Sequence, residues 1–87
     1  MRAQSSKQAR KEREFARNRD KVIRRADGRC EIRVGMVCRS VAATAHHVRL
    51  RSRGGGHDIN NLVATCNACH RYVHEHPEWA RENGWIA

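Results

Sequence analysis

Four cysteines constrain this 87-residue chain more than any other feature, because they can cross-link a domain that has little else to stabilise it. Only 39% of the residues are hydrophobic, with one Phe, one Tyr and two Trp, so the core that the chain can bury is small. Domains of this size commonly depend on disulfides or a bound metal to offset the entropy lost on folding. We therefore expect the fold to bring four side chains together: Cys30, Cys38, Cys66 and Cys69.

The cysteines could form two disulfides or one metal site, and their context favours the metal. The N-terminal sequence MRAQSSKQARKEREFARNRDK is charged throughout and lacks the apolar run of a secretory signal peptide. We therefore expect a cytoplasmic protein without membrane-spanning segments, in a compartment where thiols stay reduced and zinc-bound thiolates persist. Cys66 and Cys69 have the spacing of a zinc knuckle, and four thiolates around one Zn²⁺ form a closed structural site.

Basic residues dominate the charge of the chain and predict a polyanionic partner. The formal net charge is +9, and 15 of the 18 basic residues are Arg, the side chain that binds phosphates through two parallel hydrogen bonds. Residues 1–29 hold eleven Lys or Arg against four Asp or Glu, whereas residues 30–87 hold seven against five. This distribution favours nucleic acid as the partner, and a surface that only keeps the chain soluble is the alternative.

The first 29 residues are predicted to form a basic helical arm, and residues 30–87 a separate zinc-stapled domain. Residues 4–26 lack Gly and Pro and are rich in helix-forming residues, so we expect a helix that the Asp27-Gly28 turn signal ends. Its last turn, with Val22 and Ile23, would dock on the domain. A disordered tail without a role is the alternative.

The domain itself is predicted to be small and α+β, from segments that alternate between strand, loop and helix patterns. His76-Pro77 should separate two helices, because a residue before proline avoids the helical region, and Gly84 should end the second. The segments are an extended pair in CEIRVGMVC around Gly35, strands in SVAATAHHV and LVATC, a loop in RSRGGGHDINN, and helices in NACHRYVHEH and PEWARENG.

Two pairs of histidines are the second chemical feature of the sequence. His70 and His74 are four residues apart, so both rings would project from one helix face, as in chelating pairs. Surface histidines on a polar face are the alternative. His46 and His47 are adjacent in a predicted strand, where neighbouring side chains point to opposite faces. They can serve one site only if the strand is irregular or ends there, and the following RLRSRGGG favours such an end.

The stretch AHHVRLRSRGGGHDINNLVATCNACHRYVH closely resembles the HNH nuclease motif in its form with paired cysteines. The resemblance covers about residues 30–76, and HPEWARENGW is similar to the segment C-terminal to the motif in small phage-type HNH proteins. It implies a ββα-metal fold and metal-dependent hydrolysis of double-stranded DNA, with little sequence preference. A phage terminase or other packaging protein is a further partner that the resemblance implies. The competing function is a zinc-stapled nucleic-acid-binding module without catalysis.

The resemblance also implies roles residue by residue. His47 matches the general base, Asn61 the asparagine that braces the loop and helps to hold that histidine, and His70 the metal ligand that begins the helix. His46 stands where many members have aspartate. This is similar to the colicin-type DNases, which also have a histidine at the position of His74. The implied ion is Mg²⁺, Mn²⁺, Ni²⁺, Co²⁺ or Zn²⁺, and three imidazoles favour the last four over Mg²⁺.

Other residues near the motif receive secondary interpretations. Asp58 is expected to cap or brace the turn at Asn60-Asn61 rather than bind metal. Three arginines are candidates to hold DNA phosphates: Arg49, Arg51 and Arg53. The remaining histidines, His57 and His76, are expected to be bystanders, and the aromatic side chains of Tyr72, Trp79 and Trp85 to belong to the core.

Overall fold

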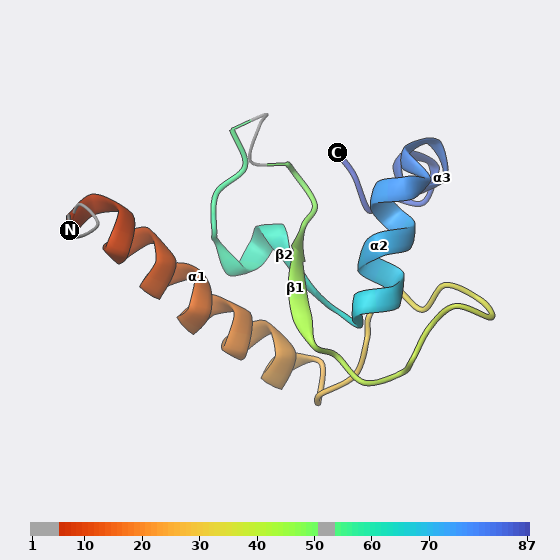
Figure 1. Cartoon of the computed structure of the whole chain (residues 1–87), viewed down its shortest axis with the longest axis horizontal. Coiled ribbons are helices and arrows are strands. Elements are labelled where there is room, and N and C mark those ends of the chain that lie inside the picture. The colour runs from red at the N-terminus through yellow and green to blue at the C-terminus, as the bar shows by residue number, and fades with distance from the viewer. Residues whose placement is uncertain (1–5, 51–53) are drawn as a thin grey trace, which may run out of the picture.

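Two short antiparallel strands form the centre of the computed structural model, which describes residues 6–50 and 54–87 (Figure 1). A long helix lies on one side of the strands and two shorter helices lie on the other. This architecture confirms the predicted α+β class. The elements are α1 (Ser6–Arg25), β1 (Thr44–His47), the short 3₁₀ helix η2 (Ile59–Asn61), β2 (Leu62–Thr65), α2 (Asn67–Glu75) and α3 (Pro77–Glu82).

The alternation of side chains along the strands divides the core into two clusters. In the register of β1 and β2, His46 pairs with Val63 and His47 pairs with Leu62. One face of the sheet packs on α1 through Ala45, Leu62 and Ala64. The second cluster joins the cysteines to α2, α3 and the C-terminus, with Tyr72, Trp79 and Trp85 packed against it as predicted: Cys30, Ile32, Val34, Cys66, Cys69, Val73, Ala80 and Ile86.

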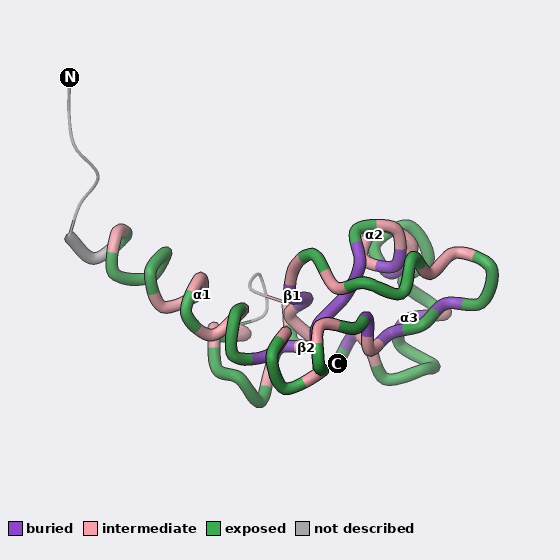
Figure 2. The backbone as a smooth tube through the Cα atoms, turned by 90° about the horizontal axis from the view of Figure 1, so that it is seen from below, coloured by how far each residue is buried: buried purple, intermediate pink, exposed green. Residues whose placement is uncertain are grey.

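The C-terminal half of α1 is anchored to the sheet, which confirms the predicted docking. Val22 is only 1% exposed and belongs to the α1-facing cluster, and Ile23 packs beside it. The Arg25 guanidinium donates hydrogen bonds to the carbonyl oxygen of Leu62 at 2.9 Å and to the Glu31 carboxylate at 3.2 Å. The first turns of α1 extend past the buried part of the molecule (Figure 2). The helix is thus fixed at its C-terminal end, and basic residues are exposed along its length, among them Arg10, Lys11 and Arg13 in the N-terminal half.

Replacing Val22 with alanine is expected to lower the free energy of unfolding by about 2 kcal/mol, because two buried methyl groups are lost and a cavity remains. Urea unfolding of the metal-loaded protein, followed by circular dichroism, measures this change. Val41→Ala removes the same atoms from a side chain that is 69% exposed, and it should leave stability nearly unchanged. Equal effects of the two substitutions would contradict the docking of α1 as a stabilising contact.

The segment between the first two cysteines differs from its prediction. The extended pair expected around Gly35 is present only at its outer end, as an antiparallel bridge between Arg29 and Val41 and a hydrogen bond from the Cys30 N–H to the Ser40 carbonyl at 2.8 Å. Inside these pairs the chain does not continue as strands, and residues 35–37 form a turn. The carbonyl oxygen of Val34 accepts hydrogen bonds from the backbone N–H groups of Val37 at 3.1 Å and Cys38 at 2.9 Å. Positive φ angles occur at three residues that are not glycine, namely Arg33, Met36 and Ser40. The chain curls here so that both cysteines of the segment reach one point.

No helix within the described ranges is long and apolar enough to cross a membrane.

Candidate functional site

The four cysteines converge on one point beside the start of α2, as the sequence predicted. Their sulfur atoms all lie within 4.8 Å of one another, and three of the four residues are buried. All four are free thiols. Cys66 is the N-cap residue of α2, and its sulfur accepts a hydrogen bond from the backbone N–H of Cys69 at 3.3 Å. The same two residues therefore begin the helix and contribute half of the cluster.

Backbone N–H groups surround the sulfurs and favour the thiolate form. Burial alone would raise the pKa of the Cys30 thiol, but hydrogen bonding with backbone groups, and to a smaller extent with the Thr65 side chain, outweighs burial and lowers that pKa to about 6. Burial raises the pKa of Cys69, so a bound cation is needed to keep this sulfur deprotonated. This donor set fits a thiolate-bound metal. The further N–H···S contacts are Val34 to Cys69 at 3.4 Å, Arg39 to Cys66 at 3.4 Å and Ser40 to Cys38 at 3.3 Å.

Three histidines form a second cluster on the other side of the α2 N-terminus. One nitrogen from each of His46, His70 and His74 lies within 4.8 Å of the other two. The Nε2 atoms of His70 and His74 are 3.2 Å apart, as expected for rings one helical turn apart. His46 reaches them from β1, with its ring centroid 5.3 Å from that of His70. The fold thus brings together the trio that the resemblance implied.

The ring of His46 is fixed by a carbonyl that the sequence could not identify. Its Nε2 lies 2.6 Å from the backbone oxygen of Trp85. A carbonyl oxygen only accepts, so Nε2 carries the proton and Nδ1 carries the lone pair. Histidines that bind metals usually donate their second ring N–H in this way. The Trp85 side chain packs on the core as predicted, but its functional atom belongs to the backbone and has no sequence signal.

Burial keeps two members of the trio neutral. It lowers the pKa of His46, with a smaller contribution from nearby His74. Burial, together with the neighbouring His46 and His74 rings, lowers the pKa of His70 to about 4. Neutral imidazole is the form that binds metals, so these residues fit a divalent cation near neutral pH without prior loss of protons.

His47 lies on the opposite face of β1 from His46, as regular strand geometry requires, at the last residue of the strand. Its ring stacks on Phe15 of α1, with centroids 5.3 Å apart and an interplanar angle of 17°. Its Nε2 lies 2.9 Å from Nδ1 of His57. His57, which the sequence analysis interprets as a bystander, therefore contacts the candidate base. The glycine-rich loop brings His57 back to the end of β1. Local spacing in the sequence does not predict a contact between two residues that a ten-residue loop brings together.

Two adjoining hollows meet at His47 and His70. The smaller, of about 280 Å³, is lined by the histidine trio together with His47 and Leu50. The larger, of about 520 Å³, lies between α1 and β1, and both His47 and His70 line it as well. Its α1 wall consists of Gln8, Lys11, Glu12 and Phe15. Helix α1, which the sequence analysis assigns to a separate arm, therefore forms one wall of the larger hollow that His47 lines.

Asn61 closes the loop that follows β1. Its Oδ1 accepts a hydrogen bond from the Arg49 N–H at 2.8 Å, and its Nδ2 donates to the carbonyl oxygens of Arg49 at 3.1 Å and Gly56 at 3.0 Å. Gly55 is required here, because a Cβ atom would collide with the Arg49 carbonyl group. Asp58 is the N-cap residue of η2, as predicted. It braces the turn through its backbone carbonyl, which accepts a hydrogen bond from the Asn61 N–H at 2.8 Å, whereas its side chain makes no capping hydrogen bond.

The three predicted phosphate-binding arginines follow β1 in the sequence. Arg49 is exposed at the end of β1. Arg51 and Arg53 lie outside the described residues.

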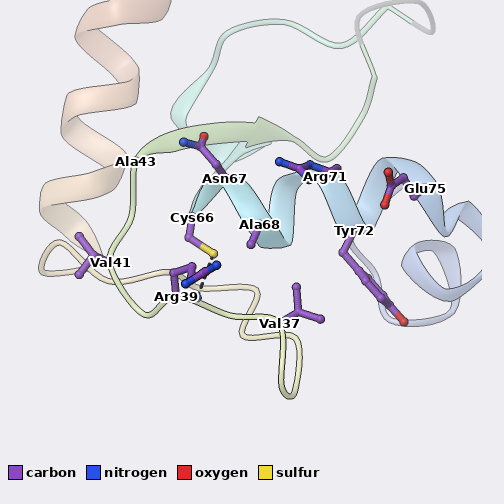
Figure 3. Close-up of a pocket in the computed structure, with 10 residues that line it drawn as sticks. All are labelled: Val37, Arg39, Val41, Ala43, Cys66, Asn67, Ala68, Arg71, Tyr72 and Glu75. Atoms are coloured by element: carbon purple, nitrogen blue, oxygen red, sulfur yellow. Dashed lines mark hydrogen bonds between the residues drawn. The ribbon is translucent and has the colours of Figure 1, made fainter.

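A further groove, of about 550 Å³, lies on the cysteine side of α2 (Figure 3). Arg39 and Arg71 border it, together with the sulfur-bearing Cys66 and the ring of Tyr72. No histidine is among the described residues that line it. The histidine clusters and this groove therefore occupy different faces of the molecule.

The comparisons with known proteins agree with this geometry. No curated protein and no solved structure matches the chain. The family model described as HNH endonuclease matches residues 28–76, which is more than half of the chain and contains all four cysteines and both histidine pairs. The chain therefore belongs to the HNH endonuclease family.

Proposed function

We propose that the chain is a metal-dependent endonuclease that hydrolyses phosphodiester bonds of double-stranded DNA with little sequence preference. The observation that supports this most is the meeting of two hollows at His47 and His70, one lined by the metal-binding trio and the other by the α1 wall. Membership of the HNH endonuclease family supports a nucleic acid substrate. The site thus combines a candidate base with a candidate metal centre along one open surface.

In the proposed reaction His47 is the general base. A neutral imidazole takes one proton from water as the water oxygen attacks phosphorus, and imidazole titrates close enough to neutral pH for this task. The bond between phosphorus and the 3′ oxygen breaks, and that oxygen takes a proton from solvent, which leaves 5′-phosphate and 3′-hydroxyl ends. A divalent ion held by His46, His70 and His74 would neutralise the phosphoryl oxygens and stabilise the departing oxygen.

Binding to DNA is proposed to depend on phosphate contacts. The net charge of +9 favours polyanions, and phosphate contacts carry no sequence information. Lys11 lines the larger hollow, where it can meet a phosphate near His47. Arg49 is exposed beside the same strand end, and we assign Arg51 and Arg53 to flanking phosphates on the basis of the family resemblance.

The cysteine site and the setting of the protein complete the proposal. Zn²⁺ is the ion that four thiolates in a closed tetrahedral site suit best, and its role here is structural. Residues 1–29 act as the basic arm and residues 30–87 as the nuclease domain. By resemblance to small phage-type HNH proteins, we propose action in the host cytoplasm beside a terminase or another packaging protein.

The test is an incubation of supercoiled plasmid with purified protein across Mg²⁺, Mn²⁺, Ni²⁺, Co²⁺ and Zn²⁺, with EDTA as the control. We expect EDTA to abolish nicking. At least one of Mn²⁺, Ni²⁺, Co²⁺ and Zn²⁺, which imidazole ligands favour, should restore nicking better than Mg²⁺ does. His74→Ala should raise the ion concentration needed for half-maximal nicking by about 10-fold or more, since one of three ligands is lost.

His76→Ala is the matched control at the C-cap of the same helix, because His76 is exposed and its ring stacks on Tyr72 rather than on the trio. Circular dichroism and bound-zinc measurements before the assay establish that the cysteine site has survived the chelator. DNA binding without cleavage under every ion would instead support the non-catalytic nucleic-acid-binding module.

A further inference from the structure

Two rings from separate segments, Phe15 and His57, pack against the candidate base His47. Phe15 of α1 stacks on His47, and His57 of the loop approaches both, with ring centroids 5.2 Å from Phe15 and 5.1 Å from His47. Within this cluster the polar contact is the 2.9 Å approach of His47 Nε2 to His57 Nδ1. One proton must lie between these two nitrogens for them to form a hydrogen bond.

We propose that His57 is a positioning residue that fixes the tautomer of His47. In this arrangement His47 Nε2–H donates to His57 Nδ1, so that His47 Nδ1 carries the lone pair. The inference rests on the proposed function of His47 as the base. It specifies which nitrogen of His47 accepts the proton from water, and it names His57 as the residue that fixes this tautomer.

The alternative placement of the shared proton is incompatible with catalysis by His47. If His57 Nδ1–H donated to His47 Nε2, the neutral His47 ring would carry its own proton on Nδ1. Its lone pair would then be engaged by His57, and neither nitrogen could accept a proton from water. With Nε2 as the donor, proton transfer to Nδ1 makes an imidazolium whose Nε2–H bond to His57 becomes charge-assisted and stronger.

The surroundings hold His57 in place for this role. Its backbone carbonyl accepts a hydrogen bond from the Asn18 side-chain amide of α1 at 2.8 Å. The preceding carbonyl, that of Gly56, accepts from Asn61 at 3.0 Å. The loop that carries His57 is therefore tied to α1 on one side and to η2 on the other. Through Asn18 and Phe15, α1 supports the geometry of the base as well as adding positive charge.

Two substitutions separate the hydrogen bond from the packing. His57→Phe keeps an aromatic ring beside Phe15 but has no acceptor, whereas His57→Asn supplies an oxygen acceptor near the position of Nδ1. We expect His57→Phe to lower kcat of plasmid nicking by about 10-fold or more with little change in KM, and His57→Asn to recover most of the loss. Circular dichroism confirms that both variants are folded.

The tautomer is measured directly on the zinc-loaded full chain by long-range ¹H–¹⁵N correlation spectra of the histidine rings. We expect wild-type His47 to be protonated at Nε2, and the His57→Phe protein to show a mixture. Equal rates for His57→Phe and wild type would overturn the inference and leave the nuclease proposal standing. A wild-type His47 protonated at Nδ1 would overturn both the inference and the role of His47 as the base, whereas metal-dependent nicking by the wild type would still support a nuclease. Absence of nicking by the wild type would overturn the nuclease proposal, and with it the catalytic role of His57, whatever the spectra show.

Discussion

Replacing His47 with alanine is expected to lower the rate of plasmid nicking by about 10²–10⁴-fold, the usual contribution of a general base. The trio of His46, His70 and His74 does not include this ring, so metal binding should survive. His47 is half-buried at the end of β1, and the strand is anchored by the buried Ala45, so the fold should survive as well. Conversion of supercoiled to open-circular plasmid, at a saturating concentration of the activating ion, measures the effect.

His76→Ala is the control for this substitution, since it removes an exposed imidazole from the same domain and should leave the rate unchanged. Metal content and circular dichroism should be the same for wild type and both variants. An unchanged nicking rate for His47→Ala would exclude this residue as the base and make His57, whose imidazole also lines the larger hollow, the next candidate to test.

The chemistry of the site was predictable from the sequence where it depends on local spacing. Cys66 and Cys69 flank one tight turn, and His70 and His74 lie one turn apart on α2, so helical geometry alone brings each pair together. The approach of His46 to that helix was expected only from the family resemblance. Antiparallel pairing of β1 with β2 supplies the reason, because it places His46 opposite Val63 on the face toward α2.

Tertiary contacts account for what the sequence did not reveal. The carbonyl of Trp85 contacts His46 across 39 residues, and His57 reaches His47 around a glycine-rich loop. Neither contact produces a periodic pattern in the sequence from which it could be predicted. The turns between Cys30 and Cys38 were mistaken for strands because β-branched residues there are spaced as in strands, whereas convergence of the cysteines requires the chain to curl.

Helix α2 connects the cysteine cluster and the histidine trio. Cys66 caps the helix, Cys69 lies in its first turn, and His70 follows directly. Any change in the direction of this first turn moves His70 and His74 relative to His46. We therefore expect formation of the trio to depend on the cysteine cluster, although no cysteine is among the described residues that line the hollow of the trio.

Replacing Cys69 with serine is accordingly expected to unfold the protein at 25 °C. Structural Zn²⁺ contributes about 10–16 kcal/mol in zinc-finger peptides, whereas a whole domain is stable by only about 5–15 kcal/mol. Cys69 is fully buried beside Val73, so the serine hydroxyl would replace a thiolate in an apolar site. Bound zinc, measured colorimetrically after denaturation, and thermal melting followed by circular dichroism should both show the loss. His74→Ala should retain the zinc and the melting transition, whereas a Cys69→Ser protein that melted like the wild type would show that the core alone holds the fold.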